Sequence, residues 1–105
     1  MSYVVVALYK PGQDLIKAAY AAGHVEHFVR NLHHVLVGGQ LRSDDGVTPL
    51  GGMMVLDYDK IEDVRSFLAD DPYHQQGVFG SVSIQRIHVQ IPEKEPGELL
   101  RLARP

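Results

Sequence analysis

The stretch DDPYHQQGVF at residues 70–79 determines how this chain divides into helices and strands. Proline lacks a backbone N–H and disfavours a helical residue before it, so a helix that ends near Asp70 cannot continue through Pro72. Asp71 is placed to cap a second, short turn that has Pro72 at its first position. Gly77 supplies the left-handed backbone conformation that ends such a turn. We therefore expect a helix, a short capped turn and a strand to follow one another here.

The residues on either side of this stretch set the bounds of that helix and strand, and they predict one further strand before the helix. Residues 53–58 are mostly apolar and follow a glycine pair, which is typical of a strand. A helix then begins, with Asp59 as its N-cap and Glu62 as the capping-box partner. The final strand is expected from residue 81 to about residue 91. Its apolar residues change face along the way, so a bulge near residues 85–86 is the simplest interpretation.

The N-terminal half predicts a strand, one long helix and a second, short strand. Residues 3–9 are apolar on both faces, so both faces of this strand should be covered. From residue 14 to residue 37 the apolar residues recur at three- and four-residue steps, as in a helix packed on a core. A glycine pair at residues 38–39 is expected to end the helix, and residues 40–42 to form a short strand. The apolar stripe of the helix consists of Leu15, Ala18, Ala22, Val25, Val29, Leu32 and Leu36.

These elements give the order βαββαβ, which predicts an α+β fold: a ferredoxin-like subunit with an antiparallel sheet. A chain of 105 residues is long enough for one domain. We assign residues 1–91 to this domain and residues 92–105, which begin with a proline-rich linker, to a C-terminal tail or arm. The order of elements alone is compatible with many functions.

Composition excludes several classes of protein. The net charge is −3 and no basic cluster is present, which argues against a nucleic-acid partner. No stretch reaches the ~18 apolar residues of a membrane span. The absence of cysteine and of a leader-like N-terminus leads us to expect a cytoplasmic protein. Phosphate-binding glycine loops and the serine-hydrolase elbow are also absent from the sequence.

Three short motifs resemble the YCII-related family. They are Asp-Pro-Tyr at residues 71–73, Gly-Val-Phe at residues 77–79 and Val-Ser-Ile at residues 82–84. The resemblance extends over about residues 3–91 and is strongest over residues 51–89. It implies a dimeric α+β barrel, in which two sheets face each other with the helices outside. We therefore expect a homodimer or a higher homo-oligomer.

The six histidines raise the question of a metal site. His24 and His27 are the only pair at close helical spacing, and no H-E-x-x-H motif is present. A third ligand would have to come from elsewhere, such as Asp71 or His74. We therefore expect no metal, and no other cofactor.

The family resemblance assigns a role to one histidine of the first helix. It implies a His–Asp pair that performs acid–base chemistry on quinone-like compounds, with Asp71 as the carboxylate. Ala21 stands where the family's usual arginine precedes the histidine, so the register leaves both His24 and His27 open. We favour His24. Imidazole exchanges protons near neutral pH, and a carboxylate fixes its tautomer while it also caps a turn.

Other side chains are candidates for the wall of a binding pocket. Tyr73, Tyr9 and Phe79 would supply aromatic surface. Arg42, with Ser43 beside it, would bind an anionic group of the substrate. The family's usual Gly-Pro corner is missing near these two residues, which predicts an altered rim and an altered substrate.

Two functions stay open at this stage. The first is a small cofactor-independent enzyme, a lyase or an isomerase, that performs elimination, isomerisation or proton transfer on a small aromatic or quinone-like compound. The second is a non-catalytic module that binds a small ligand or supports a partner enzyme, in which His24 and Asp71 would not face each other. An oxygen-using monooxygenase has less support, because the sequence lacks tryptophan.

Overall fold

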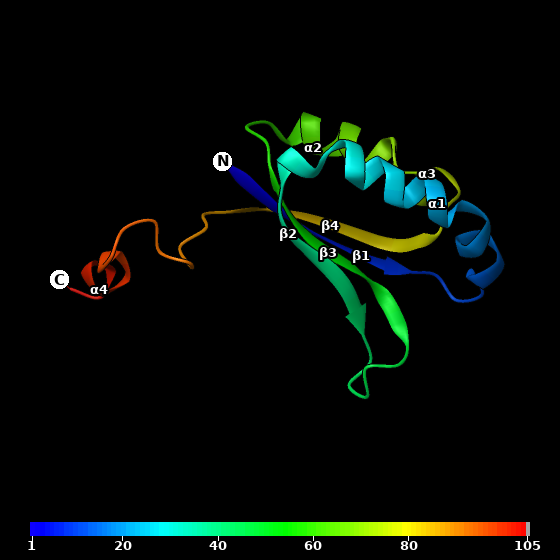
Figure 1. The fold of residues 1–105 in the computed structure, drawn as a ribbon, viewed down its shortest axis with the longest axis horizontal. Coiled ribbons are helices and arrows are strands. Elements are labelled where there is room, and N and C mark those ends of the chain that lie inside the picture. The colour runs from blue at the N-terminus through cyan, green and yellow to red at the C-terminus, as the bar shows by residue number, and fades with distance from the viewer. Residues whose placement is uncertain (105) are drawn as a thin grey trace.

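The computed structural model describes residues 1–104, which form a four-stranded antiparallel sheet with helices on one face (Figure 1). The sheet order is β2-β3-β1-β4, so β1 lies inside the sheet between β3 and β4. The predicted ferredoxin-like α+β fold is confirmed. The elements are β1 (Ser2–Tyr9), α1 (Asp14–Arg30), β2 (Val35–Arg42), β3 (Pro49–Asp57), α2 (Ile61–Ala69), α3 (Pro72–Gln75), β4 (Phe79–Ile87) and α4 (Glu98–Leu102).

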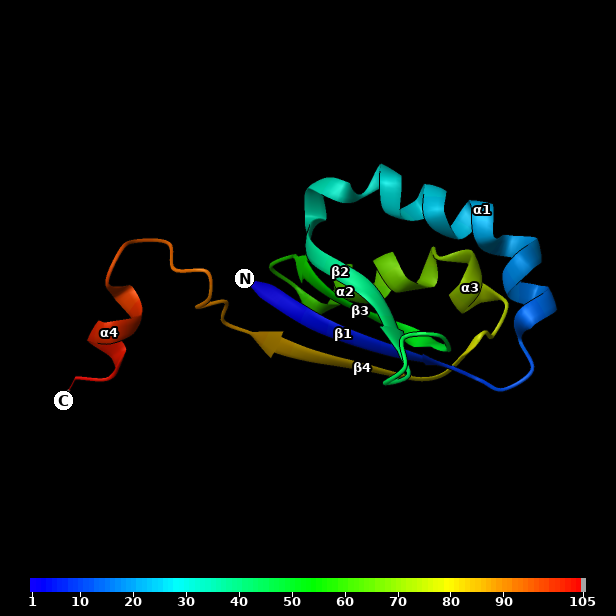
Figure 2. The ribbon, with the colours of Figure 1, turned by 60° about the horizontal axis from the view of Figure 1, so that its bottom comes forward.

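The core lies between the sheet and helices α1 and α2 (Figure 2). Val5 of β1 stands opposite Met54 of β3 and Ile84 of β4; Val5 and Met54 are buried in this core, and the half-buried Ile84 packs against it. Side chains alternate between the faces of a strand, so Val4 and Val6 lie on the opposite face. Among residues 1–104 no helix covers that second face (Figure 2), so its cover, which a second copy of the sheet would supply, stays a prediction.

The first helix is shorter than predicted. It ends at Arg30, because Asn31 donates its amide to the carbonyl of His27 at 2.7 Å and its backbone N–H to the carbonyl of Phe28 at 3.0 Å. A 3₁₀ turn (Leu32–His34) follows, and β2 then begins at Val35. The glycine pair therefore does not cap a helix; Gly38 pairs with Met54 inside the sheet.

The apolar stripe of α1 is exposed, contrary to the pattern of a core-facing helix. Leu15 is 87% exposed and Val29 is 60% exposed, whereas the buried residue of α1 is His27. The opposite face of the helix packs on aromatic groups, including Phe67 of α2. The contacts with Phe67 lie far away in sequence, so the periodicity of α1 alone indicated the wrong face as the buried one.

Two further local predictions are wrong. Lys60, and not Asp59, is the N-cap of α2, and its side chain makes no capping bond; the Asp59 carboxylate instead lies 3.4 Å from the N-terminal amino group. The pairing of β4 with β1 is regular from Ser81 to Ile87, and the irregularity lies between Leu8 and Tyr9. In the strand, Ile84 stands opposite Val5 on the core face, whereas Ile87, the last strand residue, stands opposite Ser2 on the other face without a bulge. The apolar residues beyond Ile87 lie outside the strand.

The stretch at residues 70–79 has the predicted structure. Asp71 is the N-cap of α3, and its carboxylate accepts the backbone N–H of Tyr73 at 3.0 Å. Pro72 occupies the first turn, and Gly77 has a φ of 69°. This part of the fold is set by neighbours in sequence, which explains why the sequence alone predicts it.

Beyond β4 the chain leaves the sheet and ends in α4, well away from the rest of the domain (Figures 1 and 2). The assignment of residues 92–105 to a tail or arm stays a prediction, and residue 105 lies outside the described residues. Within residues 1–104 no helix is both long enough and apolar enough to cross a membrane.

Candidate functional site

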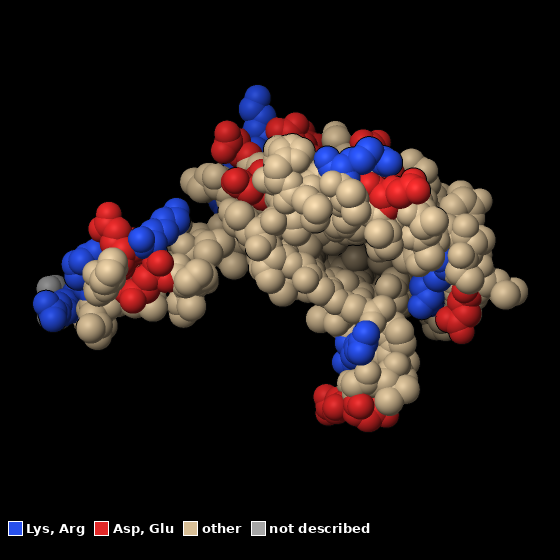
Figure 3. All heavy atoms as spheres, in the orientation of Figure 1, with Lys and Arg blue, Asp and Glu red and all other residues tan. Residues whose placement is uncertain are grey.

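A cavity of about 590 Å³ lies between α1, the sheet and the α2–α3 corner. Figure 3 shows the hollow beneath α1, surrounded by uncharged surface. Within the described residues its lining contains no Lys, Arg, Asp or Glu. Small-molecule sites in proteins are typically apolar hollows of this size with a few polar groups.

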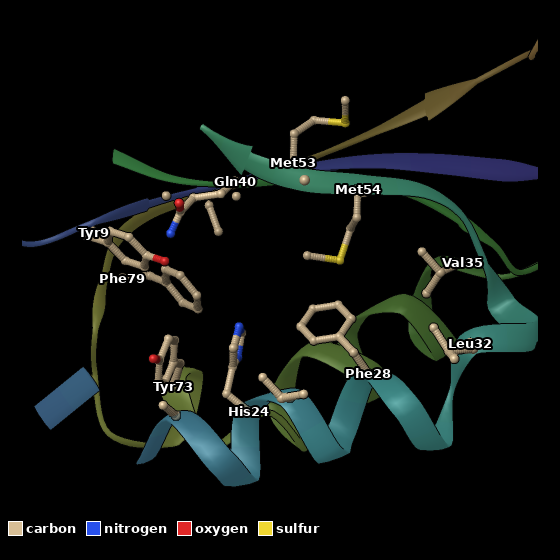
Figure 4. A pocket seen from close by; sticks show the side chains of 17 residues that line it. Tyr9, His24, Phe28, Leu32, Val35, Gln40, Met53, Met54, Tyr73 and Phe79 are labelled. Carbon is tan, nitrogen blue, oxygen red and sulfur yellow. The ribbon is translucent and has the colours of Figure 1, made fainter. Parts of the chain in front are cut away.

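Three aromatic residues expected at a pocket do line this cavity. Tyr9 and Phe79 stack with their ring centroids 5.8 Å apart, and Tyr73 meets Tyr9 edge to face at 6.4 Å (Figure 4). Tyr9 ends β1, Phe79 begins β4 and Tyr73 lies in α3. The aromatic wall is therefore built where two strand ends meet the turn that Asp71 caps.

His24 reaches into the cavity from α1 and contacts the carboxylate of Asp71. Its Nδ1 lies 2.7 Å from Asp71 Oδ1. Asp71 is 3% exposed, and the same oxygen accepts the N–H of Tyr73, so the carboxylate is fixed from two sides. An ionised carboxylate only accepts hydrogen bonds, so the neutral His24 ring carries its proton on Nδ1 and presents an unprotonated Nε2.

The His24 ring is also held in place by stacking. Its plane lies 7° from that of Tyr73, with centroids 3.9 Å apart, and Tyr73 donates its hydroxyl to the carbonyl of Lys17 at 3.0 Å. Burial, and to a smaller extent Tyr9 and Asp71, raise the pKa of the Tyr73 hydroxyl above its ordinary value. Tyr73 therefore remains a neutral hydrogen-bond donor at physiological pH.

Glycines give the sheet wall of the cavity its shape. Gly38, Gly39, Gly51 and Gly52 all line it. A Cβ at Gly39 would meet nothing within 4 Å, so this position is open space. A Cβ at Gly51, where φ is 154°, would lie 2.0 Å from the carbonyl oxygen of Ala7, so no other residue fits there without a backbone shift.

Some lining residues were not expected from the sequence. Phe28 lies four residues after His24 on the same face of α1, and this spacing is a signal that could have identified it. Gln40 and Met54 enter the cavity from β2 and β3 (Figure 4). Their orientation depends on the register of the two strands, which the sequence did not give.

Three expected site residues do not reach the cavity. His27 is 2% exposed and faces Phe67, with ring centroids 4.5 Å apart; within the described residues its Nε2 has no hydrogen-bond partner. Arg42 donates from Nε to Gln40 Oε1 at 2.8 Å. Ser43 Oγ donates to Asp45 at 2.6 Å in the following turn, and this bond lowers the pKa of the Asp45 carboxyl. None of the three lines the hollow.

The histidines do not converge on a common point. Among residues 1–104, no group of three or more His, Cys, Asp or Glu side chains is arranged to hold a metal ion. His74 is exposed, and His34 stacks on Tyr58 outside the cavity.

The fold and the cavity together define a class, namely small ferredoxin-like α+β proteins with an apolar cavity between helix and sheet. A model of the YCII-related domain matches residues 1–88, so the chain belongs to the YCII-related family. No curated protein matches the sequence significantly.

Two solved structures share the fold at low sequence identity. The 5-chloro-2-hydroxyhydroquinone dehydrochlorinase of Burkholderia phenoliruptrix AC1100, in complex with 2,5-dihydroxybenzoquinone, is 20% identical with a TM-score of 0.75; the match covers 84% of this chain and 94% of that one. SnoaB, a cofactor-independent oxygenase of Streptomyces nogalater, is 14% identical with a TM-score of 0.50; the match covers 88% of this chain and 96% of that one. At these identities the likeness concerns the fold.

Proposed function

We propose that this protein is a cofactor-independent enzyme that uses His24 and Asp71 for acid–base chemistry on a small oxygenated ring compound. His24 Nε2 takes a proton from the substrate and returns it to the product or to water. Asp71 holds the imidazole in the tautomer that leaves Nε2 free. The reaction is an elimination, an isomerisation or a proton transfer, so the enzyme is a lyase or an isomerase.

One observation carries this proposal: the 2.7 Å contact between His24 Nδ1 and Asp71 Oδ1 at the wall of the cavity. A positioned imidazole whose orientation is fixed by a carboxylate is a standard general base near neutral pH. For a non-catalytic module, the sequence led us to expect that His24 and Asp71 would not face each other. His27 is less suitable as the base, because it faces Phe67 and not the cavity.

The lining of the cavity favours a flat ligand. Aromatic rings from α1, α3 and two strand ends line the cavity and offer flat apolar surface on which a planar ring can pack. The dehydrochlorinase with the same fold acts on a chlorinated hydroxyhydroquinone, which supports the choice of an oxygenated ring. Its quinone ligand, 2,5-dihydroxybenzoquinone, is called the quinone probe below.

The first test is turnover of 5-chloro-2-hydroxyhydroquinone, in which the loss of HCl releases one proton and one chloride per molecule. We expect chloride release by the wild type, and a fall of about 100-fold or more in kcat/KM for His24→Gln. His88→Gln is the matched control, because His88 is exposed beyond β4. If His24→Gln releases chloride at the rate of the wild type, the proposal is wrong.

A second readout covers substrates that carry no chlorine. Incubation of the protein with the quinone probe in D₂O reports exchange of the ring hydrogens by proton NMR. Exchange accelerated by the wild type and not by His24→Gln supports proton transfer. Binding of the probe with neither exchange nor turnover in any hydroxylated ring compound would favour the non-catalytic alternative.

We also propose that two copies pair through the open face of the sheet. This face carries apolar side chains, among them Leu8, which is 41% exposed, and Val37, which is 54% exposed. Burial of such a surface against a second copy is favourable. We expect a dimer by light scattering, a monomer for Val6→Lys on this face, and an unchanged dimer for Leu15→Lys on α1. A monomeric wild type would contradict the pairing.

A further inference from the structure

We propose that Gln40 binds an oxygen atom of the ligand through its side-chain N–H groups and so decides which edge of the ring faces His24. This inference rests on the proposed function, since it assumes a ligand in the same cavity. It adds a specificity-determining residue on the sheet wall, opposite the helix wall that carries the base.

The position of Gln40 follows from the register of β2. Gln40 pairs with Gly52 of β3, and both line the cavity. Figure 4 shows the Gln40 amide on the sheet side of the cavity, beside the rings of Tyr9 and Phe79. Because Gly52 has no side chain, nothing on the neighbouring strand stands between this amide and the hollow.

Arg42 sets the orientation of the amide. Its Nε donates a hydrogen bond to Gln40 Oε1 at 2.8 Å, and its terminal nitrogen reaches the carbonyl of Gly46 at 3.5 Å. A guanidinium group only donates, so the side chain of Gln40 must present its oxygen to Arg42. The NH₂ group is thereby directed away from Arg42, and within residues 1–104 it has no hydrogen-bond partner. Arg42, expected as a ligand-binding residue, is here a positioning residue.

Polar groups of the cavity wall therefore stand on two sides. His24 Nε2 on the helix side is placed to accept a proton, and the NH₂ group of Gln40 on the sheet side is free to donate hydrogen bonds. Removal of a proton from an oxygenated ring places negative charge on a ring oxygen. A donor already oriented towards the ligand stabilises that charge without further reorganisation. The pair thus selects rings that carry an acceptor oxygen on the side away from His24.

The test is binding of the quinone probe at pH 7, measured by calorimetry. Gln40→Leu removes the donors, and Gln40→Glu keeps the size while it offers only acceptors. We expect Gln40→Leu to bind the probe about fivefold to tenfold more weakly than the wild type, and Gln40→Glu to bind it more weakly still. The affinity of Arg42→Met should lie between those of the wild type and Gln40→Leu. The control is Gln90→Leu, an exposed glutamine beyond β4, which should bind as the wild type does. Thermal unfolding of each variant verifies that it is folded. Because Gln40 is exposed, its substitution should leave the midpoint of unfolding unchanged.

Each outcome decides between the two proposals. A wild type that binds the probe, with both Gln40 variants binding equally well, overturns the role of Gln40 and leaves the His24–Asp71 proposal intact. A wild type that does not bind overturns the ligand class and the role of Gln40 with it. Retained affinity in Gln40→Leu together with lost affinity in Gln90→Leu would also contradict the inference.

Discussion

The two walls of the cavity are built on different principles. The helix wall is held by specific contacts. His24 forms a hydrogen bond with Asp71 and stacks on Tyr73, and Tyr73 donates a hydrogen bond to the carbonyl of Lys17. The sheet wall is shaped mainly by missing side chains, since four glycines line it. The comparison teaches that the proposed base and most of the space for a ligand come from separate parts of this fold, so substitutions on the two walls should have different effects.

The largest effect is expected from Gly51→Ala on the sheet wall. The added Cβ would lie 2.0 Å from the carbonyl oxygen of Ala7, at a φ of 154°. We expect a loss of roughly 3 kcal/mol or more in the free energy of unfolding, or failure to fold. Gly39→Ala is the control, because its Cβ meets nothing within 4 Å. Equal stability of the two variants in urea would refute this view of the sheet wall.

On the helix wall, Asp71→Asn should separate catalysis from stability. Asparagine caps a helix as well as aspartate does, so the stability should change by less than about 1 kcal/mol. The charge that orients His24 is lost, so we expect kcat/KM for chloride release to fall by about 100-fold. Asp71→Ala, which removes the cap as well, should additionally lower the free energy of unfolding by about 1 kcal/mol. Full activity in Asp71→Asn would contradict the role of the helix wall in catalysis.

A smaller effect concerns the pH dependence of stability. Burial raises the pKa of the Tyr73 hydroxyl in the folded protein, so the folded state favours the neutral phenol. The corresponding stabilisation is complete below the ordinary value near 10 and is lost as the pH rises through the raised folded value. Urea unfolding between pH 8 and pH 11 should therefore show a steeper alkaline loss in the wild type than in Tyr73→Phe. Burial also raises the pKa of the Tyr58 hydroxyl. Tyr58 is present in both proteins, so its contribution cancels in the comparison.

The smallest effect is expected from His27→Leu. His27 lies one turn after His24, is 2% exposed and leaves its Nε2 without a partner in the described chain. Replacement of an unsatisfied buried polar group by an apolar one is nearly neutral or stabilising. The variant should keep its midpoint of thermal unfolding or raise it, with an unchanged rate of chloride release. A large loss of activity would contradict this prediction and indicate that His27, and not His24, is the base.

The sequence predicted the parts of the fold that depend on near neighbours. The cap at Asp71 and the turn ended by Gly77 follow from residues within a few positions. The sequence predicted only the last three residues of β2, because residues 35–39 continue a helical pattern and contain two glycines. Pairing with β3 across the sheet, for example of Gly38 with Met54, makes the whole segment a strand.

The candidate site was predictable to a similar extent. The approach of His24 to Asp71 was expected from a family resemblance, since 47 positions separate the two residues and no local rule brings them together. Phe28 could have been found from its spacing to His24. Gln40 could not, because a polar residue on a strand faces the cavity or the solvent according to a register that depends on β3.

The central claim is that Asp71 orients His24 so that an unprotonated Nε2 faces the cavity. The most direct test of this claim is a long-range ¹H–¹⁵N NMR spectrum of the histidine rings, recorded at a pH at which His24 is neutral. We predict that His24 carries its proton on Nδ1, and that Asp71→Asn changes this signal while the His88 signal stays as it is. A His24 ring protonated on Nε2, or a spectrum that Asp71→Asn leaves unaltered, would contradict the account.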